Sequence, residues 1–448
     1  MAPEEVIETA LGEGQVAVCL ASITSSKNFR VANNTVTTNG SEESVSCGLV
    51  AIEGEAVGVQ TADVQGRAQI LSLAGAARES ARANPPSPDA MPLVEPSEAA
   101  VPRPPAKAAA PNLGPVVEPL RRVLEESRRR GQLLYGYVHA AHAEEALGTR
   151  TGVRLAAASK FSSISLTLKT PDLKRSAWCG RMAEAPEAMD VEAMYQGCQE
   201  RLGWTERQLS LEPGHYQVIL EPSAVADLVV RLAWEMHARG ADEERTVFAS
   251  KSGSRVGEKM YAPSITLTSD PGAAGMQVPD FVRVLSSSEY GSVFDNGLPA
   301  PATTWIDRGV QQELICPRRW ARDHGHPVRP DAENLRLAGG SATLEEMIAG
   351  TERALLVTSL WYIRDVDPST LLLTGLTRDG VFLVEKGQVV GAVNNFRFNE
   401  SPVAALARTV EVGRAELALS REIGDMTFVE VPPLRVERFF MSSVSDAV

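Results

Sequence analysis

The stretch LLVTSLWYIRDVDPSTLLLTGLTRDGVFLVEKGQVVGAVNNFRFNESP, residues 355–402, indicates the fold of the second half of the chain. Turn signals interrupt its apolar and β-branched runs at Asp367-Pro368, at 378–380 and at Lys386-Gly387. Three segments of strand length lie after or between these turns: 371–377, 381–385 and 389–393. The pattern predicts a meander of antiparallel strands, with tight hairpins at 378–380 and 386–387, at the centre of a β-rich domain.

Polar side chains gather where this stretch ends. The alternation of a strand places Asn395, Arg397 and Asn399 on one face and the phenylalanines between them on the other. Four polar residues are therefore the candidates for a substrate groove: Asn395, Arg397, Asn399 and Glu400. A second interpretation stays open, in which Arg397 and Glu400 have only a structural role and connect the end of this strand to the following helix.

The segment TSLWYIRDVDPSTLLLTGLTRDGVFLVEKGQVVGAVNNFRFNES resembles the C-terminal signature of the TldD/PmbA (TldE) metallopeptidase family. The resemblance continues upstream in GHYQVILEPSAVADLV at 214–229 and SGSRVGEKMYAPSITLTSDP at 252–271, and it reaches FRVANNTVTTNGSEES at 29–44. It covers nearly the whole chain. It implies an α+β fold, with an N-terminal α/β domain followed by a C-terminal antiparallel β-rich domain.

The chain divides into four predicted segments: an N-terminal α+β segment 1–83, a Pro/Ala-rich linker 84–115, a second N-terminal segment 116–210 and the C-terminal β-rich domain 211–448. Within the first segment, Asn39-Gly40 is predicted to be a hairpin turn between two strands. The linker is rich in proline and alanine and is short of large apolar residues. We therefore expect it to be an extended, exposed connector.

Composition excludes several classes of function. The chain has 448 residues, of which 44% are hydrophobic and 23% charged, and its net charge of −13 disfavours binding to nucleic acid. Its five cysteines are without C-x-x-C spacing, which argues against a disulfide framework and a zinc ribbon. The N-terminus has no apolar signal core, and no apolar run approaches membrane-spanning length. We expect a cytoplasmic protein without a membrane partner.

Residues 223–239 are predicted to form one helix after Pro222, with Gly240 just past its end. Apolar residues at helical spacing form a stripe that should face the core: Val225, Leu228, Val229, Leu232 and Met236. Four polar residues at i, i+4 spacing should lie on the outer side: Asp227, Arg231, Glu235 and Arg239. This interpretation makes the helix structural.

In the catalytic TldD branch of the family, this helix carries H-E-x-x-x-H, and a cysteine far downstream completes a zinc site. Here the helix reads AVADLVVRLAWEMHARG, with no histidine in its first half. No His-Glu dipeptide occurs in the chain, and the final segment GDMTFVEVP has no cysteine, the last one being Cys316. The resemblance therefore implies the TldE (PmbA) branch, with no catalytic residue and no metal ligand in this chain.

The remaining histidines suggest no second metal site. His237 is expected on the surface near the end of the helix. His139 and His142 are interpreted as chance neighbours. His324 and His326 receive the same interpretation, with a residual possibility of weak metal binding beside Asp323.

The resemblance implies a heterodimer in which this chain is the metal-free subunit. Its partner would be a TldD-type subunit that carries H-E-x-x-x-H and zinc, and the pair would cleave unfolded or leader peptides. Two alternatives stay open. In one, the pair hydrolyses a small-molecule amide in specialised-metabolite biosynthesis; in the other, the chain is a non-enzymatic peptide-binding protein.

Overall fold

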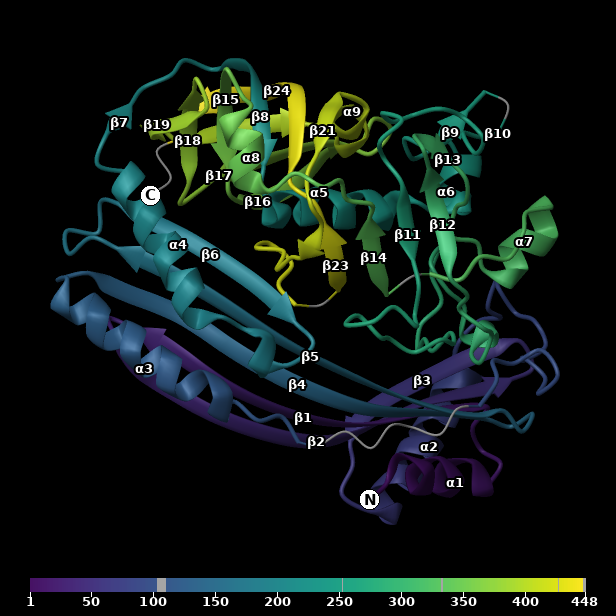
Figure 1. Cartoon of the computed structure of the whole chain (residues 1–448). Helices are drawn as coiled ribbons and strands as arrows, with labels where there is room; N and C mark the ends of the chain where they lie inside the picture. Colours follow the sequence, from purple (N-terminus) through teal and green to yellow (C-terminus); the bar gives the residue numbers. More distant parts are fainter. Residues whose placement is uncertain (103–109, 252, 332, 426, 446–448) are drawn as a thin grey trace.

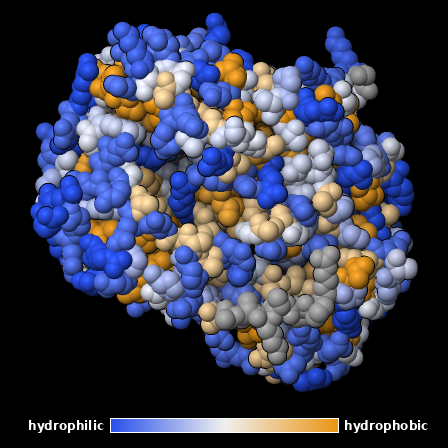
Figure 2. Space-filling model, in the orientation of Figure 1, coloured by the Kyte–Doolittle hydropathy of each residue, from blue (hydrophilic) through white to orange (hydrophobic). Residues whose placement is uncertain are grey.

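The computed structural model describes residues 1–102, 110–251, 253–331, 333–425 and 427–445. A long N-terminal sheet underlies a C-terminal lobe that is built on two further sheets (Figure 1). The fold is therefore α+β and rich in antiparallel strands, which confirms the predicted fold class. The space-filling view of the same face is hollowed between the two parts (Figure 2).

The N-terminal sheet is antiparallel, with the strand order β3-β2-β1-β4-β5-β6. Its strands are β1 (Val18–Ala32), β2 (Thr35–Glu53), β3 (Ala56–Asp63), β4 (Leu133–Thr149), β5 (Arg154–Lys169) and β6 (Ser176–Ala183). The β1–β2 hairpin turns at Asn33 and Asn34, both with positive φ, as a tight hairpin turn requires. The predicted turn at Asn39-Gly40 is wrong, because Asn39 pairs with Phe29 inside the ladder. Strand β4 supports β1 from the other side as far as Val31, so the ladder continues past that dipeptide.

Helices cover the N-terminal sheet at both ends (Figure 1). They are α1 (Pro3–Gly12), α2 (Arg67–Ala83), α3 (Gly114–Arg129) and α4 (Val191–Trp204), with the short turn η1 (Pro186–Ala188) before α4. Helix α2 approaches β3 very closely at Gly58. A Cβ atom there would lie 2.1 Å from the backbone oxygen of Ala77, so only glycine permits this packing.

The larger sheet of the C-terminal lobe has the order β16-β17-β20-β24-β8-β15-β18-β19-β7, and β21 also pairs with β24. Its strands are β7 (Gln208–Leu209), β8 (Gly214–Leu220), β15 (Arg353–Val357), β16 (Leu360–Asp367), β17 (Leu372–Thr377), β18 (Val381–Glu385), β19 (Gln388–Val393), β20 (Phe396–Glu400), β21 (Thr409–Val412) and β24 (Leu434–Val444). The predicted hairpin at Lys386-Gly387 is confirmed and joins β18 to β19. The one at 378–380 is wrong, because β20, β24, β8 and β15 lie between β17 and β18.

The second sheet of this lobe has the order β13-β12-β11-β14-β23-β22. Its strands are β11 (Leu267–Ser269), β12 (Thr303–Asp307), β13 (Val310–Gln311), β14 (Asn334–Leu337), β22 (Glu416–Leu417) and β23 (Phe428–Val431). A small pair, β9 (Ala249–Ser250) and β10 (Gly253–Ser254), and the turn η2 (Val293–Asp295) complete the lobe with its helices. The helices are α5 (Pro222–Glu235), α6 (Ala238–Asp242), α7 (Arg318–His324), α8 (Leu344–Ala349) and α9 (Pro402–Ala407). No helix among the described residues has the length and apolar character needed to cross a membrane.

The predicted single helix to Arg239 is two helices. Helix α5 ends at Glu235, and His237 caps α6 by accepting a hydrogen bond from the N–H of Gly240 at 3.0 Å. The surface position expected for His237 is wrong, because its side chain is buried in this cap and against the ring of Tyr290.

The apolar stripe of α5 lies in the main core of the C-terminal lobe, as predicted. Its expected outer side is partly wrong, since Asp227 is fully buried. Oδ1 of Asp227 accepts hydrogen bonds from the Ser420 hydroxyl at 2.5 Å and from the N–H of Glu422 at 3.2 Å. Burial raises the pKa of Asp227 to about 7. The loop segment 420–422 covers this side of the helix, a contact that no local sequence pattern predicts.

The predicted linker 84–115 is not exposed throughout. Leu93 and Ala100 are buried in an apolar cluster that the C-terminal lobe shares, and the N–H of Ala100 bonds to the carbonyl of Gly297 in that lobe. The expectation of an exposed connector is wrong for this part, because its few apolar residues find a matching apolar surface. Residues 103–109 lie outside the described residues.

Replacing Leu232 with Asp tests the burial of the α5 stripe. Leu232 has no exposed surface, so the new carboxylate would be buried without a partner. We expect the free energy of unfolding to fall by about 3 kcal/mol or more in urea denaturation. Val117→Asp on α3, where the side chain is 47% exposed, is the control and should change little. An unchanged stability of Leu232→Asp would contradict the packing described.

Asp227→Asn tests the buried carboxyl group. The folded pKa of about 7 lies above the ordinary 3.8, so the folded chain keeps a proton that the unfolded chain releases between these values. The free energy of unfolding of the wild type should therefore fall as pH rises through this window. Asn does not titrate, so we expect its stability relative to the wild type to increase by roughly 3 kcal/mol between about pH 5 and pH 8. Parallel pH curves of the two proteins, measured by urea denaturation, would rule out this titration.

Candidate functional site

The N-terminal sheet and the C-terminal lobe enclose a cavity of about 510 Å³, which we call the central cavity. Strand β5 supplies one wall, α5 a second, and loops of the C-terminal lobe the rest. Its lining residues are Ser159, Phe161, Val230, Ala233, Trp234, Val278, Pro279, Arg283, Tyr290, Asp331, Glu333, Leu335, Asp425, Thr427 and Phe428. The lining combines aromatic and aliphatic surface with a few charged groups, as ligand sites usually do.

The C-terminal half of α5 presents Val230, Ala233 and Trp234 to this cavity. Trp234 is 41% exposed although it stands on a largely buried helix. The Arg231 guanidinium lies 4.9 Å from its ring centre, a cation–π contact. The Tyr290 hydroxyl donates to the carbonyl of Trp234 at 2.6 Å, which fixes the end of the helix against the cavity wall.

Asp425, just before β23, and Phe428, its first residue, form another part of the cavity wall. The Ser163 hydroxyl donates to Oδ2 of Asp425 at 2.8 Å, and Nδ1 of His139 lies 2.9 Å from the same oxygen. Burial alone would raise the pKa of Asp425, but the bonds from His139 and Ser163 outweigh it and hold that pKa below its usual value. Because Ser163 bonds to Asp425 and not to His139, the cluster lacks the serine–histidine bond of a nucleophilic triad. Its evident effect is to hold this segment to the N-terminal sheet.

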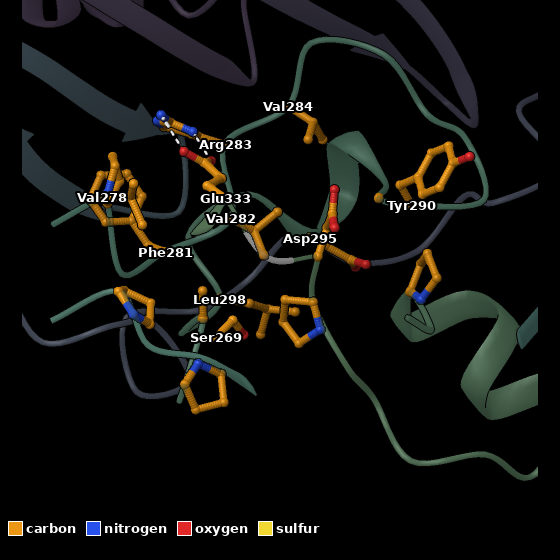
Figure 3. Close-up of a pocket in the computed structure, with 18 of the residues that line it drawn as sticks. Ser269, Val278, Phe281, Val282, Arg283, Val284, Tyr290, Asp295, Leu298 and Glu333 are labelled. Atoms are coloured by element: carbon orange, nitrogen blue, oxygen red, sulfur yellow. Dashed lines mark hydrogen bonds and ion pairs between the residues drawn. The ribbon is translucent and has the colours of Figure 1, made fainter. Parts of the chain in front are cut away.

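Arg283 joins the two parts of the molecule at the edge of the cavity. One terminal nitrogen, Nη2, donates to Glu145 of β4 and to Glu333, at 2.9 Å in each case. Nη1 bonds to the second oxygen of Glu333, and Figure 3 shows this paired arrangement. Burial raises the pKa of Glu333 above its usual value, although Arg283 opposes that shift.

A smaller cavity of about 80 Å³ adjoins the central cavity and shares its wall at Arg283 and Glu333. Phe281, Val282 and Leu298 line it, and Figure 3 shows them around the space. A volume of this size admits only a few water molecules or one small side chain. It is a side pocket, too small to add room for a larger ligand in the central cavity.

The family resemblance implies zinc, which requires several His, Cys, Asp or Glu side chains around one point. Among the described residues, no three His, Cys, Asp or Glu side chains converge as a metal site requires. The residues that α5 turns to the cavity are Val230, Ala233 and Trp234, none of which offers a zinc ligand. From the segment that leads into β23, Asp425, Thr427 and Phe428 contribute one carboxylate and no thiol. The described lining of the central cavity therefore does not fit zinc.

Three of the four candidate groove residues lie on β20 and Asn395 comes directly before it, away from both cavities described so far. Strand β20 is paired with β17 on one side and β24 on the other, so no peptide can add to its edges. Three of the four are partly exposed and share one face of the strand: Asn395, Arg397 and Asn399. Arg397 donates weakly to Thr374 at 3.4 Å, and Oδ1 of Asn399 lies 3.4 Å from the Ser442 hydroxyl. A role of this face in substrate binding stays a prediction.

Glu400 lies on the opposite face, with Phe396 and Phe398, and is buried. Its Oε1 is 2.7 Å from Nη2 of Arg408 and accepts from the N–H of Ser401 at 3.0 Å. Arg408 is the residue directly after α9, so this ion pair connects the end of β20 to the end of that helix. The contact matches the interpretation of Glu400 as a structural residue.

The pair His324 and His326 does not form a metal site in the described structure. His326 lies 2.8 Å from Asp242, and the ring of His324 stacks on Trp320 at 3.8 Å. Of His139 and His142, the first holds Asp425 and the second is buried in β4.

Sequence reasoning missed the polar and aromatic residues that shape the central cavity, namely Trp234, Arg283, Tyr290 and Asp425. One usable signal exists: a tryptophan at position 234 falls outside the apolar stripe of its helix. The other positions depend on partners far away in sequence, such as Arg283 with Glu145, which no local pattern reveals.

Three solved structures share this fold over almost the entire chain. TldE from Thermococcus kodakarensis gives a TM-score of 0.79 at 16% identity, covering 98% of this chain and 99% of that chain. A protein from Bacteroides thetaiotaomicron, described as a proposed modulator of DNA gyrase, gives 0.76 at 17% identity, with 99% and 98% covered. A Thermotoga maritima protein of the same description gives 0.75 at 14% identity, with 98% of each chain covered. At these identities the likeness establishes the fold alone.

Sequence comparison gives the family. No curated protein matches this chain significantly. The family model described as the PmbA/TldA metallopeptidase C-terminal domain matches residues 213–443, which is just over half of the chain and runs from the start of β8 into β24. The chain therefore belongs to the PmbA/TldA metallopeptidase family.

Proposed function

We propose that this chain is the TldE-type, metal-free subunit of a two-subunit zinc peptidase of this family, acting in the cytoplasm on unfolded or leader peptides. One observation carries the proposal. The two segments that bear the zinc ligands in the catalytic TldD branch both reach the central cavity here, and neither brings a zinc ligand of the expected type to it.

The first of these segments is α5, the counterpart of the helix with H-E-x-x-x-H. It presents Val230, Ala233 and Trp234. The second is the segment GDMTFVEVP, which leads into β23 and has no cysteine where the resemblance to the catalytic branch implies one; it presents Asp425, Thr427 and Phe428. The absence of a histidine or cysteine from both sets of described lining residues supports a subunit without the catalytic role. The shared fold with a protein named TldE supports the same assignment.

Amide hydrolysis requires a Lewis acid or a nucleophile together with a positioned base. The described residues in and beside the central cavity supply neither combination, since Ser163, which holds Asp425 from β5, is bonded to that carboxylate and no metal ligands converge. These residues instead form a cavity wall that a substrate can contact. Trp234, Phe161 and Phe428 give apolar surface on which substrate side chains can lie, while Arg283 holds the two parts of the molecule in register.

An extended peptide also needs a strand edge to which its backbone can bond. Strand β16 lies at the end of the larger C-terminal sheet and offers such an edge. Its side chains Tyr362 and Val366 are about half exposed, at 51% and 52%. An edge of this kind suits either the partner subunit or the substrate.

The proposal predicts activity only in the pair. Peptide hydrolysis should be absent from this chain alone, absent or weak in a TldD-type partner alone, and present in the mixture. We expect Trp234→Ala to lower the turnover of the mixture, because it removes apolar surface from the cavity wall, while the pair still forms in size-exclusion chromatography. Tyr135→Ala, an aromatic truncation on β4 outside the lining of the central cavity, is the matched control for that wall. Arg397→Ala then reports whether the exposed face of β20 contacts substrate.

Hydrolysis by this chain alone that survives a chelator would refute the metal-free role. Full activity of the partner alone would refute the need for this chain. A mixture that forms but cleaves only small amides would favour the alternative role in specialised metabolism.

The purified chain should hold no stoichiometric zinc, because no described group of ligands fits it. Metal analysis after purification without added metal should give far less than one zinc per chain, with the TldD-type partner measured in parallel as the positive control. About one tightly held zinc per chain would overturn the assignment, and loss of that zinc in His326→Ala would locate it at α7.

A further inference from the structure

A second and larger cavity lies beside the N-terminus of α5, and we call it the α4 cavity because α4 forms one wall. It encloses about 870 Å³ between α4 and β6 on one side and the start of α5, α8 and β19 on the other. In Figure 1, α4 and β6 belong to the N-terminal part of the molecule, and α8 and β19 lie across from them in the C-terminal lobe. Among the described residues, the α4 cavity shares none of its lining with the central cavity.

A buried carboxylate stands at the wall of this cavity. Glu221, just before α5, is 6% exposed, and its Oε2 accepts from Nη2 of Arg201 at 2.8 Å. Arg201 also donates through Nη1 to the carbonyl of Trp178 at 2.8 Å and to the sulfur of Cys179 at 3.3 Å. Oε1 of Glu221 has no hydrogen-bond partner among the described residues. A buried acceptor left in this state costs about 1–3 kcal/mol, which a donor brought by a ligand would recover.

The charge of the lining favours a cation. It contains five carboxylates and three guanidinium groups. Arg201 is already paired with Glu221, and Arg181 is paired with Glu416. Among the described lining residues, three carboxylates then remain against the guanidinium of Arg414: Asp190, Glu200 and Glu345.

The rest of the wall is apolar and adaptable. Met182, Met189 and Met194 line the cavity together with Trp178 and Trp204. Methionine side chains reshape easily around different apolar groups, and tryptophan faces attract cations. A ligand that carries a positive group on an apolar body therefore matches both components of the lining.

We propose that the α4 cavity is a second binding site, which takes the guanidinium or ammonium side chain of a short peptide segment, with Oε1 of Glu221 as its buried acceptor. This site lies outside the central cavity, and a second binding site goes beyond the proposed function. The charged end of the ligand bonds to Glu221, and the neighbouring apolar side chain lies among the methionines and tryptophans.

Direct binding to the full-length chain tests the proposal without any partner subunit or zinc. The probe is N-acetyl-Phe-Arg-amide, titrated by calorimetry, with tryptophan fluorescence as a second readout because Trp178 and Trp204 line the cavity. The matched ligand is the same peptide with citrulline in place of arginine, which keeps the shape and removes the charge. We expect saturable binding of the arginine peptide that is about tenfold or more tighter than that of the citrulline peptide.

Two variants locate the site. Ala193 is exposed on α4 and lines the cavity, so Ala193→Trp should fill the space and abolish binding without lowering the melting temperature. Glu221→Gln should weaken binding about tenfold or more, and its effect is counted only if its melting temperature stays near that of the wild type. Glu206→Gln, an exposed carboxylate outside the lining, is the control and should bind as the wild type does.

Equal affinity for the arginine and citrulline peptides would overturn the proposal, as would binding that survives Ala193→Trp. The amine agmatine, which has the guanidinium group without a peptide, should bind more weakly. Agmatine binding as tightly as the peptide would overturn the peptide assignment. Because binding is measured on this chain alone, its failure leaves the paired peptidase role untouched, and the reverse also holds.

Discussion

Helix α5 is buried along most of its length between the sheets of the C-terminal lobe, and this burial positions both cavities. A helix buried on nearly every side must carry small or apolar residues all round, and ten of its residues, from Pro222 to Leu232, are buried. Its two ends emerge at different places: the start at the α4 cavity, and Trp234 at the central cavity. Pro222 and Val230 are about 12 Å apart along such a helix. One rigid element therefore connects the two sites.

Much of the fold was predictable from the sequence where local patterns and final contacts agree. The hairpin at Lys386-Gly387 and the apolar stripe around Leu232 are cases of this kind. The turn at Asn39-Gly40 failed because a turn dipeptide is a weak local preference, and pairing with neighbouring strands outweighs it. The outward position of Asp227 failed because the covering loop comes about 190 residues later in the chain.

The candidate site was less predictable than the fold. The resemblance pointed to α5 and to the segment that leads into β23, and residues of both line the central cavity. It gave no indication of Arg283 or of the bond between His139 and Asp425, which join segments that are 138 and 286 residues apart. Polar residues on β20 attracted attention because alternation is visible in sequence, whereas the placement of that strand inside the sheet is not.

Strand β24 has a consequence for the synthesis of this protein. It occupies the interior of the larger C-terminal sheet, between β20 and β8, yet it consists of residues 434–444. While the chain is being made, β8 is available more than two hundred residues before the strand that must pair with it. Until then the apolar side chains and open backbone groups at this gap are a ready target for other nascent chains. The pairing of β8 with β24 therefore has to wait for residues 434–444, and loss of these residues would leave the larger sheet open at its centre.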